Sequence, residues 1–357
     1  MFEGDLGKLQ RDCELAAKLW GRTFSGLGAM TFREKGEAAI GQLWVLLLSQ
    51  HQDGFYKQGL KKLGIGEDEP PAVAAAKYHY FTNQIGGLEM EYVEESAKKV
   101  WIRYTAPMWT YAGVSMLAMP GSLRRKIFTG WHPHNGRMMN CPRLGWVSTK
   151  FIMEGEPYDE GYFIEYDHDL APGEEMRYEV AARTPEFDPD QAPKLDRGLW
   201  PDARMFKARR NWSREYVRTT IDCLLQMFSE QATHFILQQA MRCLAIQYTH
   251  ELKQDVGTVG NDARSVTALF AGLLEACDQD FEVLHVSDLK HRIVLRSFKP
   301  FDRDSASEGL RAACFQFQEM AARILNGRLS VTRHPEPGLG PVDYEVWEIE
   351  DTGRWLW

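Results

Sequence analysis

Histidine, asparagine and cysteine side chains cluster in one short segment of the sequence. The segment WHPHNGRMMNC, residues 131–141, contains His132, His134, Asn135 and Cys141. A cysteine beside a histidine can lose its proton and attack an amide, amidine or activated carbonyl, with the histidine as general base. We therefore predict Cys141 as a nucleophile and His134 or His132 as its base. The alternative is a loop with solvated histidines and a small, buried, unreactive cysteine.

The same two histidines also suggest a metal site. The spacing His132-Pro133-His134 places two imidazoles on one side of an extended segment. Asp167 and His168, which follow a predicted strand, could complete a mixed nitrogen and oxygen ligand set. A divalent metal ion is therefore the one cofactor that the sequence suggests, although two histidines at this spacing also occur without a metal.

A second group of titratable side chains lies at the end of that strand, in FIEYDHD. Glu165 and Asp167 alternate onto one strand face, where a carboxylate in a partly apolar pocket could act as a general base. A related segment near the end of the chain keeps Glu348 but has no histidine. Asp167 and His168 are therefore the stronger candidates, and an exposed acidic strand end is the alternative.

Arginine and aromatic residues suggest how a substrate could be held. Arg103 could bind a carboxylate through two parallel hydrogen bonds. A related segment later in the chain has Arg296 at the matching position, so a structural ion pair is the alternative role for Arg103. Aromatic side chains nearby could line a pocket for a flat ligand or simply fill the core. The predicted substrate-binding residues are Arg103, Tyr104, Trp109, Tyr111, Trp131 and Asn135.

The elements that would position these residues occur twice. A shift of 193 residues aligns 88–107 with 281–300 without a gap, and a shift of 192 places Trp20 on Trp212. Later the shift is 183, so the interval before the second hairpin is ten residues longer in the first copy, and that interval contains 131–141. We predict two tandem copies that form a pseudo-two-fold pair, with the chemistry in the first copy and a structural role for the second.

The hydrophobic periodicity predicts the same order of elements in each copy. Long helices come first, then a third helix, a strand hairpin, another helix and a second hairpin. This order predicts an α+β fold rather than alternating β-α-β units. The Pro- and Asp-rich stretch 189–205 is a predicted linker between a first repeat, 1–188, and a second repeat, 206–357.

Composition limits the environment and the partners. The net charge of −8 argues against a nucleic-acid partner, because phosphate binding needs a basic face. The sequence contains no run of about 18 apolar residues, so it predicts no membrane span. The polar N-terminus lacks the apolar core of a signal peptide. Six scattered cysteines fit reduced thiols, so we expect a cytoplasmic protein that works on a small molecule, either alone or as a homo-oligomer.

The residues VWIRYTAPMW from Val100, Cys141-Pro142 and FIEYDHD from Phe163 resemble the L-2-amino-thiazoline-4-carboxylic acid hydrolase family. The resemblance implies a fold related to vinyl-reductase-type and heme–nitric-oxide-sensor domains. Members of that family generally have a cysteine shortly after the second strand, whereas this chain has Ala106 to Trp109 there. The resemblance therefore implies the fold rather than the family's own reaction.

Two functions follow from these patterns. The first is a hydrolase of C–N bonds, or a lyase, that acts on a small aromatic or heterocyclic molecule with the cluster His132, His134, Cys141, Asp167 and His168. The second is a small-ligand-binding or sensor domain of vinyl-reductase-like type, in which aromatic side chains hold an apolar ligand and no reaction occurs.

Overall fold

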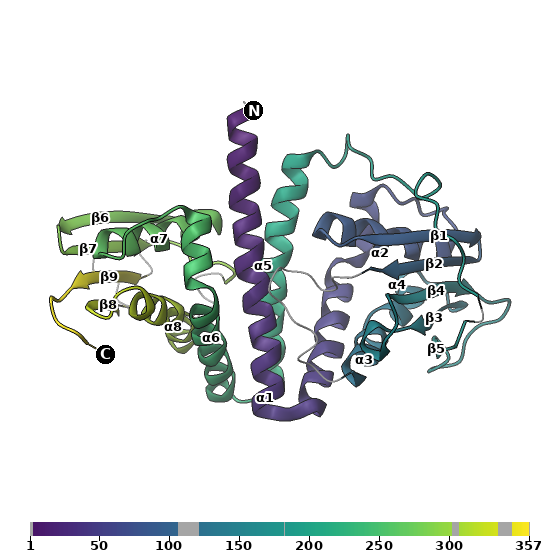
Figure 1. Ribbon diagram of the computed structural model, residues 1–357. Coiled ribbons are helices and arrows are strands. Elements are labelled where there is room, and N and C mark those ends of the chain that lie inside the picture. Colours follow the sequence, from purple (N-terminus) through teal and green to yellow (C-terminus); the bar gives the residue numbers. More distant parts are fainter. Residues whose placement is uncertain (1–2, 106–120, 182, 302–306, 335–344, 357) are drawn as a thin grey trace. The chain divides into compact units, whose positions relative to one another are not determined.

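The computed structural model describes residues 3–105, 121–181, 183–301, 307–334 and 345–356, and it shows an α+β fold (Figure 1). The predicted fold class is therefore confirmed. The chain divides into two compact units. Unit 1 comprises Met1–Glu34 and Arg210–Trp357, and unit 2 comprises Lys35–Arg209. No helix in the described ranges is both long enough and apolar enough to span a membrane.

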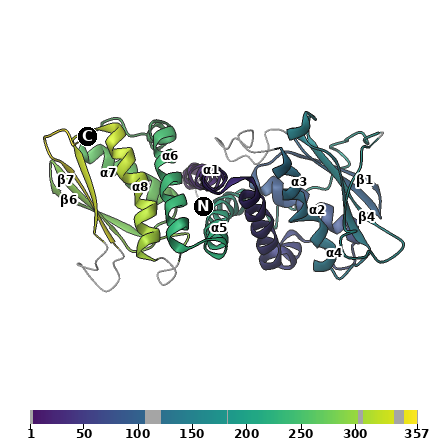
Figure 2. The same ribbon diagram turned by 90° about the horizontal axis from the view of Figure 1, so that it is seen from below.

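Unit 2 is a five-stranded sheet with helices on one face (Figure 2). The strand order is β1-β2-β4-β3-β5, antiparallel except for β3 and β5, which are parallel. The helix α2 packs against β1, β2 and β4. The strands are β1 (Met90–Ser96), β2 (Lys99–Tyr104), β3 (Leu144–Lys150), β4 (Asp159–Glu165) and β5 (Met176–Tyr178). The helices are the second part of α1 (Glu3–Leu63), α2 (Pro71–Gly86), α3 (Ser122–Thr129) and α4 (Asn135–Met138).

Unit 1 has a four-stranded antiparallel sheet in the order β6-β7-β9-β8. Figure 2 shows α7 and α8 on one face of this sheet, and α6 packs on α8. The strands are β6 (Phe281–Ser287), β7 (Lys290–Leu295), β8 (Leu329–His334) and β9 (Glu345–Asp351). The helices are the first part of α1, most of α5 (Asp202–Met227), α6 (Glu230–Val256), α7 (Ala263–Ala276) and α8 (Glu308–Leu325).

The two sheets share one topology over four strands. The orders β1-β2-β4-β3 and β6-β7-β9-β8 are the same pattern of two hairpins. The first hairpins do not follow the 193-residue shift, because Val100 pairs with Glu94 whereas Ile293 pairs with Val283. The hairpin turns between Ser96 and Lys99 and between Ser287 and Lys290 are 191 residues apart, so the predicted alignment is two residues out of step with the strands. The pseudo-two-fold pairing of the copies stays a prediction.

The copies differ between their hairpins. In the described part of this interval, the second copy has the helix α8, whereas the first has α3, a short 3₁₀ turn over His132–His134, and α4. Pro133 limits a continuous α-helix there, because it lacks an amide donor. The extra residues of the first copy thus replace one regular helix by three short segments. The strand β5, in the chain before the predicted linker, was not anticipated from the sequence.

The compact units do not follow the order of the repeats along the chain. Residues before Lys35 belong to unit 1, together with the second repeat. The predicted linker is irregular from residue 189 to 201, after which α5 begins. The boundary in α1 lies at Gly36, whose φ of 83° and ψ of −178° interrupt the helix. In the second copy the chain is interrupted at the corresponding place, between the end of α5 and the start of α6. There Ser229 caps α6 by accepting a hydrogen bond from the Ala232 amide.

The break at Gly36 gives a prediction about stability. Its backbone conformation is almost restricted to glycine, and a Cβ there would meet no atom within 4 Å, so substitution tests the backbone alone. We expect Gly36→Ala to lower the free energy of unfolding by about 1–3 kcal/mol. Gly54 also has open space around a Cβ but lies within regular α1. Gly54→Ala should therefore raise that free energy by up to about 1 kcal/mol. Urea unfolding of both variants tests this, and effects of the same sign would contradict it.

Candidate ligand-binding site

The predicted base His132 lies inside a stack of aromatic rings in unit 2. Its side chain is 3% exposed, and its ring centroid is 4.2 Å from that of Trp146 and 4.4 Å from that of His79. Its Nε2 is hydrogen-bonded to the hydroxyl of Tyr104 at 2.8 Å. Burial, with smaller contributions from His79 and Arg124, holds the pKa of His132 well below its ordinary value. His132 is therefore a neutral core side chain rather than a solvent-facing base.

Asn135 connects a second buried histidine to this stack. Its Nδ2 is 2.7 Å from Nε2 of His79, and its Oδ1 accepts a hydrogen bond from Gln52. Burial lowers the pKa of His79 to about 3, although the hydrogen bond from Asn135 opposes this shift. Sequence reasoning missed His79, because a single histidine in the apolar helix VAAAKYHYFTNQI has no pattern that marks it. Its unusual position on an apolar helical face was the one available signal.

The other predicted catalytic residues do not join this cluster. Cys141 is 8% exposed, and within the described ranges its sulfur forms no hydrogen bond with a histidine. His134 is half-buried, and burial followed by the charge of Arg137 lowers its pKa. Asp167 is 91% exposed and forms an ion pair with Lys98, with 2.6 Å between its oxygen and the amine.

His168 is also exposed, beside Tyr166. The predicted catalytic residues thus divide between a buried core and an exposed strand end. Among the residues that the structure describes, no three histidine, cysteine, aspartate or glutamate side chains are placed to hold a metal ion. The described side chains therefore provide no support for the predicted divalent metal site.

The predicted substrate-binding residues of unit 2 have structural partners. Arg103 is buried between Glu160, at 2.5 Å, and Glu91, at 2.7 Å, so it forms the structural ion pair considered as the alternative above. Tyr104 bonds His132, as described. Trp131 is half-buried, with its ring centroid 5.1 Å from that of His79. The remaining predicted residues, Trp109 and Tyr111, lie outside the described residues.

A partly open cavity lies instead in unit 1, within the second repeat and the first part of α1. Its volume is about 90 Å³, and its walls are mostly apolar. The walls come from α1, α5, α6, α7, α8 and β9 together with the segment that follows β7. Phe270, Phe315 and Trp347 form part of the lining, with 5.6 Å between the ring centroids of Phe315 and Trp347.

Unit 2 also has a cluster of rings between its helices and its sheet. The ring centroid of Phe163 on β4 is 5.5 Å from that of His79 and 5.6 Å from that of His132. In unit 1, the ring centroid of Phe270 on α7 is 6.4 Å from that of Trp347. The cluster of unit 2 therefore contains histidines, whereas the rings of unit 1 named above are phenylalanine and tryptophan and border the cavity.

A few polar groups face this apolar cavity. Trp20 Nε1 and Gln318 Oε1 are buried, and neither has a hydrogen-bond partner among the described residues. Glu345 is fully buried and accepts hydrogen bonds from Trp347 Nε1 at 2.6 Å and Arg333 Nε at 2.5 Å. Burial raises the pKa of the Cys314 thiol to about 12, so this cysteine is not a thiolate at neutral pH. Among the described lining residues, Trp20 Nε1 is thus a donor and Gln318 Oε1 an acceptor that a ligand could engage.

The cavity lies in the repeat for which the sequence predicted only a structural role. Sequence reasoning searched for reactive side chains, and the second repeat has few of them. Closely spaced aromatic residues in ACFQFQ and SFKPF were the available signal, but they are equally typical of an ordinary core. A cavity is a property of packing, which periodicity does not reveal.

Comparison with known proteins gives no relative for this chain. No protein-family model, no curated protein and no solved structure matches it. The resemblance to the L-2-amino-thiazoline-4-carboxylic acid hydrolase family therefore stays a prediction. Function has to be argued from the geometry of the units themselves.

The buried histidines of unit 2 predict a pH dependence of stability. The pKa of His79 is about 3 when folded and about 6.5 when unfolded, so the unfolded chain binds more protons below pH 6.5. Stability should therefore fall as the pH decreases, by about 2 kcal/mol from His79 alone between pH 7 and pH 5. His132 acts in the same direction.

Urea unfolding at the two pH values measures this effect. The double variant His79→Phe/His132→Phe replaces both titratable imidazoles by phenyl rings and should lose most of the pH dependence. His168→Asn changes an exposed histidine and should keep it. An unaltered dependence in the double variant would show that these histidines are not the cause.

Proposed function

We propose that this protein is a small-ligand-binding or sensor protein whose ligand occupies the cavity of unit 1. The observation that carries the proposal is the partly open, mostly apolar cavity of about 90 Å³, whose lining includes the buried, unpartnered atoms Trp20 Nε1 and Gln318 Oε1. Ligand sites typically combine an apolar wall with a few polar groups that fix orientation. The ligand class is a compact, mostly apolar molecule.

The energetics favour an occupied cavity. An empty volume of this size costs about 2 kcal/mol, at about 24 cal/mol for each Å³. Buried polar atoms without partners add to that cost. A ligand that fills the space and satisfies these atoms recovers both contributions. A cavity of about 150 Å³ holds benzene, so this smaller one suits the compact part of a ligand rather than a large molecule.

Catalysis has weaker support than binding. A cysteine hydrolase needs a thiolate and a base in contact, whereas His132 is neutral and buried and Asp167 is exposed. A larger hollow of about 470 Å³ in unit 2, beside Gly87 and Phe187, is wide open to solvent. It does not exclude water from a ligand. The hydrolase or lyase function stays an untested prediction.

A cavity-filling substitution tests the proposal. Leu237 on α6 lines the cavity, so Leu237→Phe should fill part of it, preserve or raise the free energy of unfolding, and abolish binding of benzyl alcohol as a neutral probe. Leu244 on the same helix is equally buried but does not line the cavity. Leu244→Phe should lower the free energy of unfolding by about 1–3 kcal/mol and keep binding.

Isothermal titration calorimetry and urea unfolding of the three proteins provide both readouts. Benzyl alcohol that binds equally well to Leu237→Phe would place the probe elsewhere. If the unchanged protein does not bind the probe either, the proposed use of the cavity is wrong.

A further inference from the structure

A row of side chains on α5 leads from two arginines to the cavity. Arg210, Arg214, Val217 and Ile221 are spaced by four, three and four residues, so they lie on one face of the helix. Val217 and Ile221 line the cavity. The two guanidinium groups therefore stand at the end of a helix face whose next turns form the cavity wall.

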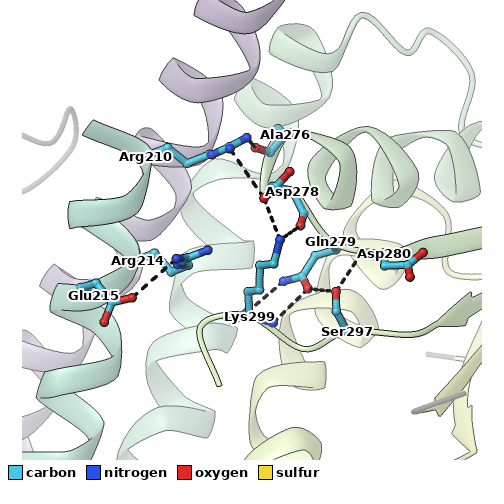
Figure 3. A network of polar contacts seen from close by, with 9 residues as sticks. All are labelled: Arg210, Arg214, Glu215, Ala276, Asp278, Gln279, Asp280, Ser297 and Lys299. Carbon is cyan, nitrogen blue, oxygen red and sulfur yellow. Dashed lines mark hydrogen bonds and ion pairs between the residues drawn. The ribbon is translucent and has the colours of Figure 1, made fainter. Parts of the chain in front are cut away.

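A third cation approaches the same end from the segment after β7. Lys299 lines the cavity, as does Cys277. The Lys299 amine is 2.7 Å from Asp278 Oδ2, and a guanidinium nitrogen of Arg210 is 3.6 Å from the same oxygen (Figure 3). Burial favours the neutral acid, but Lys299, Arg210 and Arg214 together hold the pKa of Asp278 below its ordinary value. All three cations thus act on one small region beside the cavity.

The two arginines have hydrogen-bond donors to spare. Arg214 lies 3.6 Å from Glu215 and Arg210 lies 3.6 Å from Asp278, which are ion pairs but exceed hydrogen-bond length. The Nε atoms of both arginines are buried without a partner among the residues that the structure describes. By contrast, Arg333 in the same unit donates to both Glu345 and Glu308 at 2.5–2.7 Å. A buried N–H without an acceptor is costly, so these donors favour an additional anion.

The loop that carries Lys299 is held in place. Gln279 donates to the Lys299 carbonyl at 2.8 Å and accepts from the Lys299 amide at 2.9 Å (Figure 3). Ser297 donates to Gln279 at 2.8 Å and accepts from the Asp280 amide at 2.7 Å. Because these bonds fix the loop, little conformational entropy is lost when a ligand binds there.

We propose that Arg210, Arg214 and Lys299 form a head-group site at the end of the cavity, and that the ligand is a small carboxylic acid with a compact aromatic or branched body. This inference rests on the proposed function. The apolar body occupies the cavity, and the carboxylate remains outside the apolar lining beside the cations. Three cations face the carboxylates of Asp278 and Glu215, which leaves one positive charge. That balance suits a monoanion and disfavours a dianion such as a phosphate monoester.

The test compares benzoate with benzyl alcohol, a neutral molecule of similar size, by isothermal titration calorimetry on the full chain. Benzoate should bind the unchanged protein at least about tenfold more tightly. Arg214→Gln should remove that difference while benzyl alcohol binds as before. Arg218→Gln, one turn further along α5 at a half-buried position beside Asp222, should keep it. Increasing NaCl from 0.05 to 0.5 M should weaken only benzoate binding, a readout that needs no variant.

The outcomes separate this inference from the proposal on which it rests. If benzyl alcohol binds as tightly as benzoate, or if benzoate binding is unaffected by both salt and Arg214→Gln, the head-group site is wrong and the apolar cavity proposal stands. If neither probe binds, both are wrong. A preference for benzoate that disappears at high salt and in Arg214→Gln supports a head-group site that binds a carboxylate.

Discussion

In each unit, large rings pack between the helices and one face of a sheet. Unit 1 uses Phe270, Phe315 and Trp347, and unit 2 uses His79, His132 and Phe163. Two sheets that share one strand order thus pack against rings of different chemistry. The polarity of these rings decides which other side chains each unit needs around them.

The buried imidazoles of unit 2 need polar side chains around them. Asn135 and Gln52 engage His79, and Tyr104 engages His132, because each buried imidazole needs hydrogen-bond partners. This arrangement uses side chains that the sequence suggested for substrate binding. The phenylalanine rings of unit 1 have no polar atoms that need partners. At the cavity beside them, Trp20 Nε1 and Gln318 Oε1 are buried without a partner among the described residues.

The sequence predicted the fold better than the site. Both sheets have the predicted order of two hairpins, because alternation and helical periodicity are local properties. The repeat located the strands of both sheets, but its 193-residue shift is two residues out of step with the strand pairing. The side-chain surroundings were not predictable in this way. His132 and Asp167 are both plausible catalytic residues by type, yet one is buried in a ring stack and the other is exposed to solvent.

The cationic cluster illustrates the same limit. Arg210 and Arg214 share a helix face by spacing alone, but only the fold brings Lys299 and the cavity wall to them. Long-range contacts of this kind are set by how the sheet and its helices pack. A sequence without relatives contains no direct record of them.

The most direct measurement is the NMR signal of the Trp20 indole N–H during a titration with benzoate. Trp20 lines the cavity of unit 1, whereas Trp131 belongs to the histidine stack of unit 2. If the ligand occupies the cavity, the Trp20 signal should shift and saturate while the Trp131 signal stays in place. A Trp20 signal that does not move, with or without a shift of Trp131, would contradict the central claim.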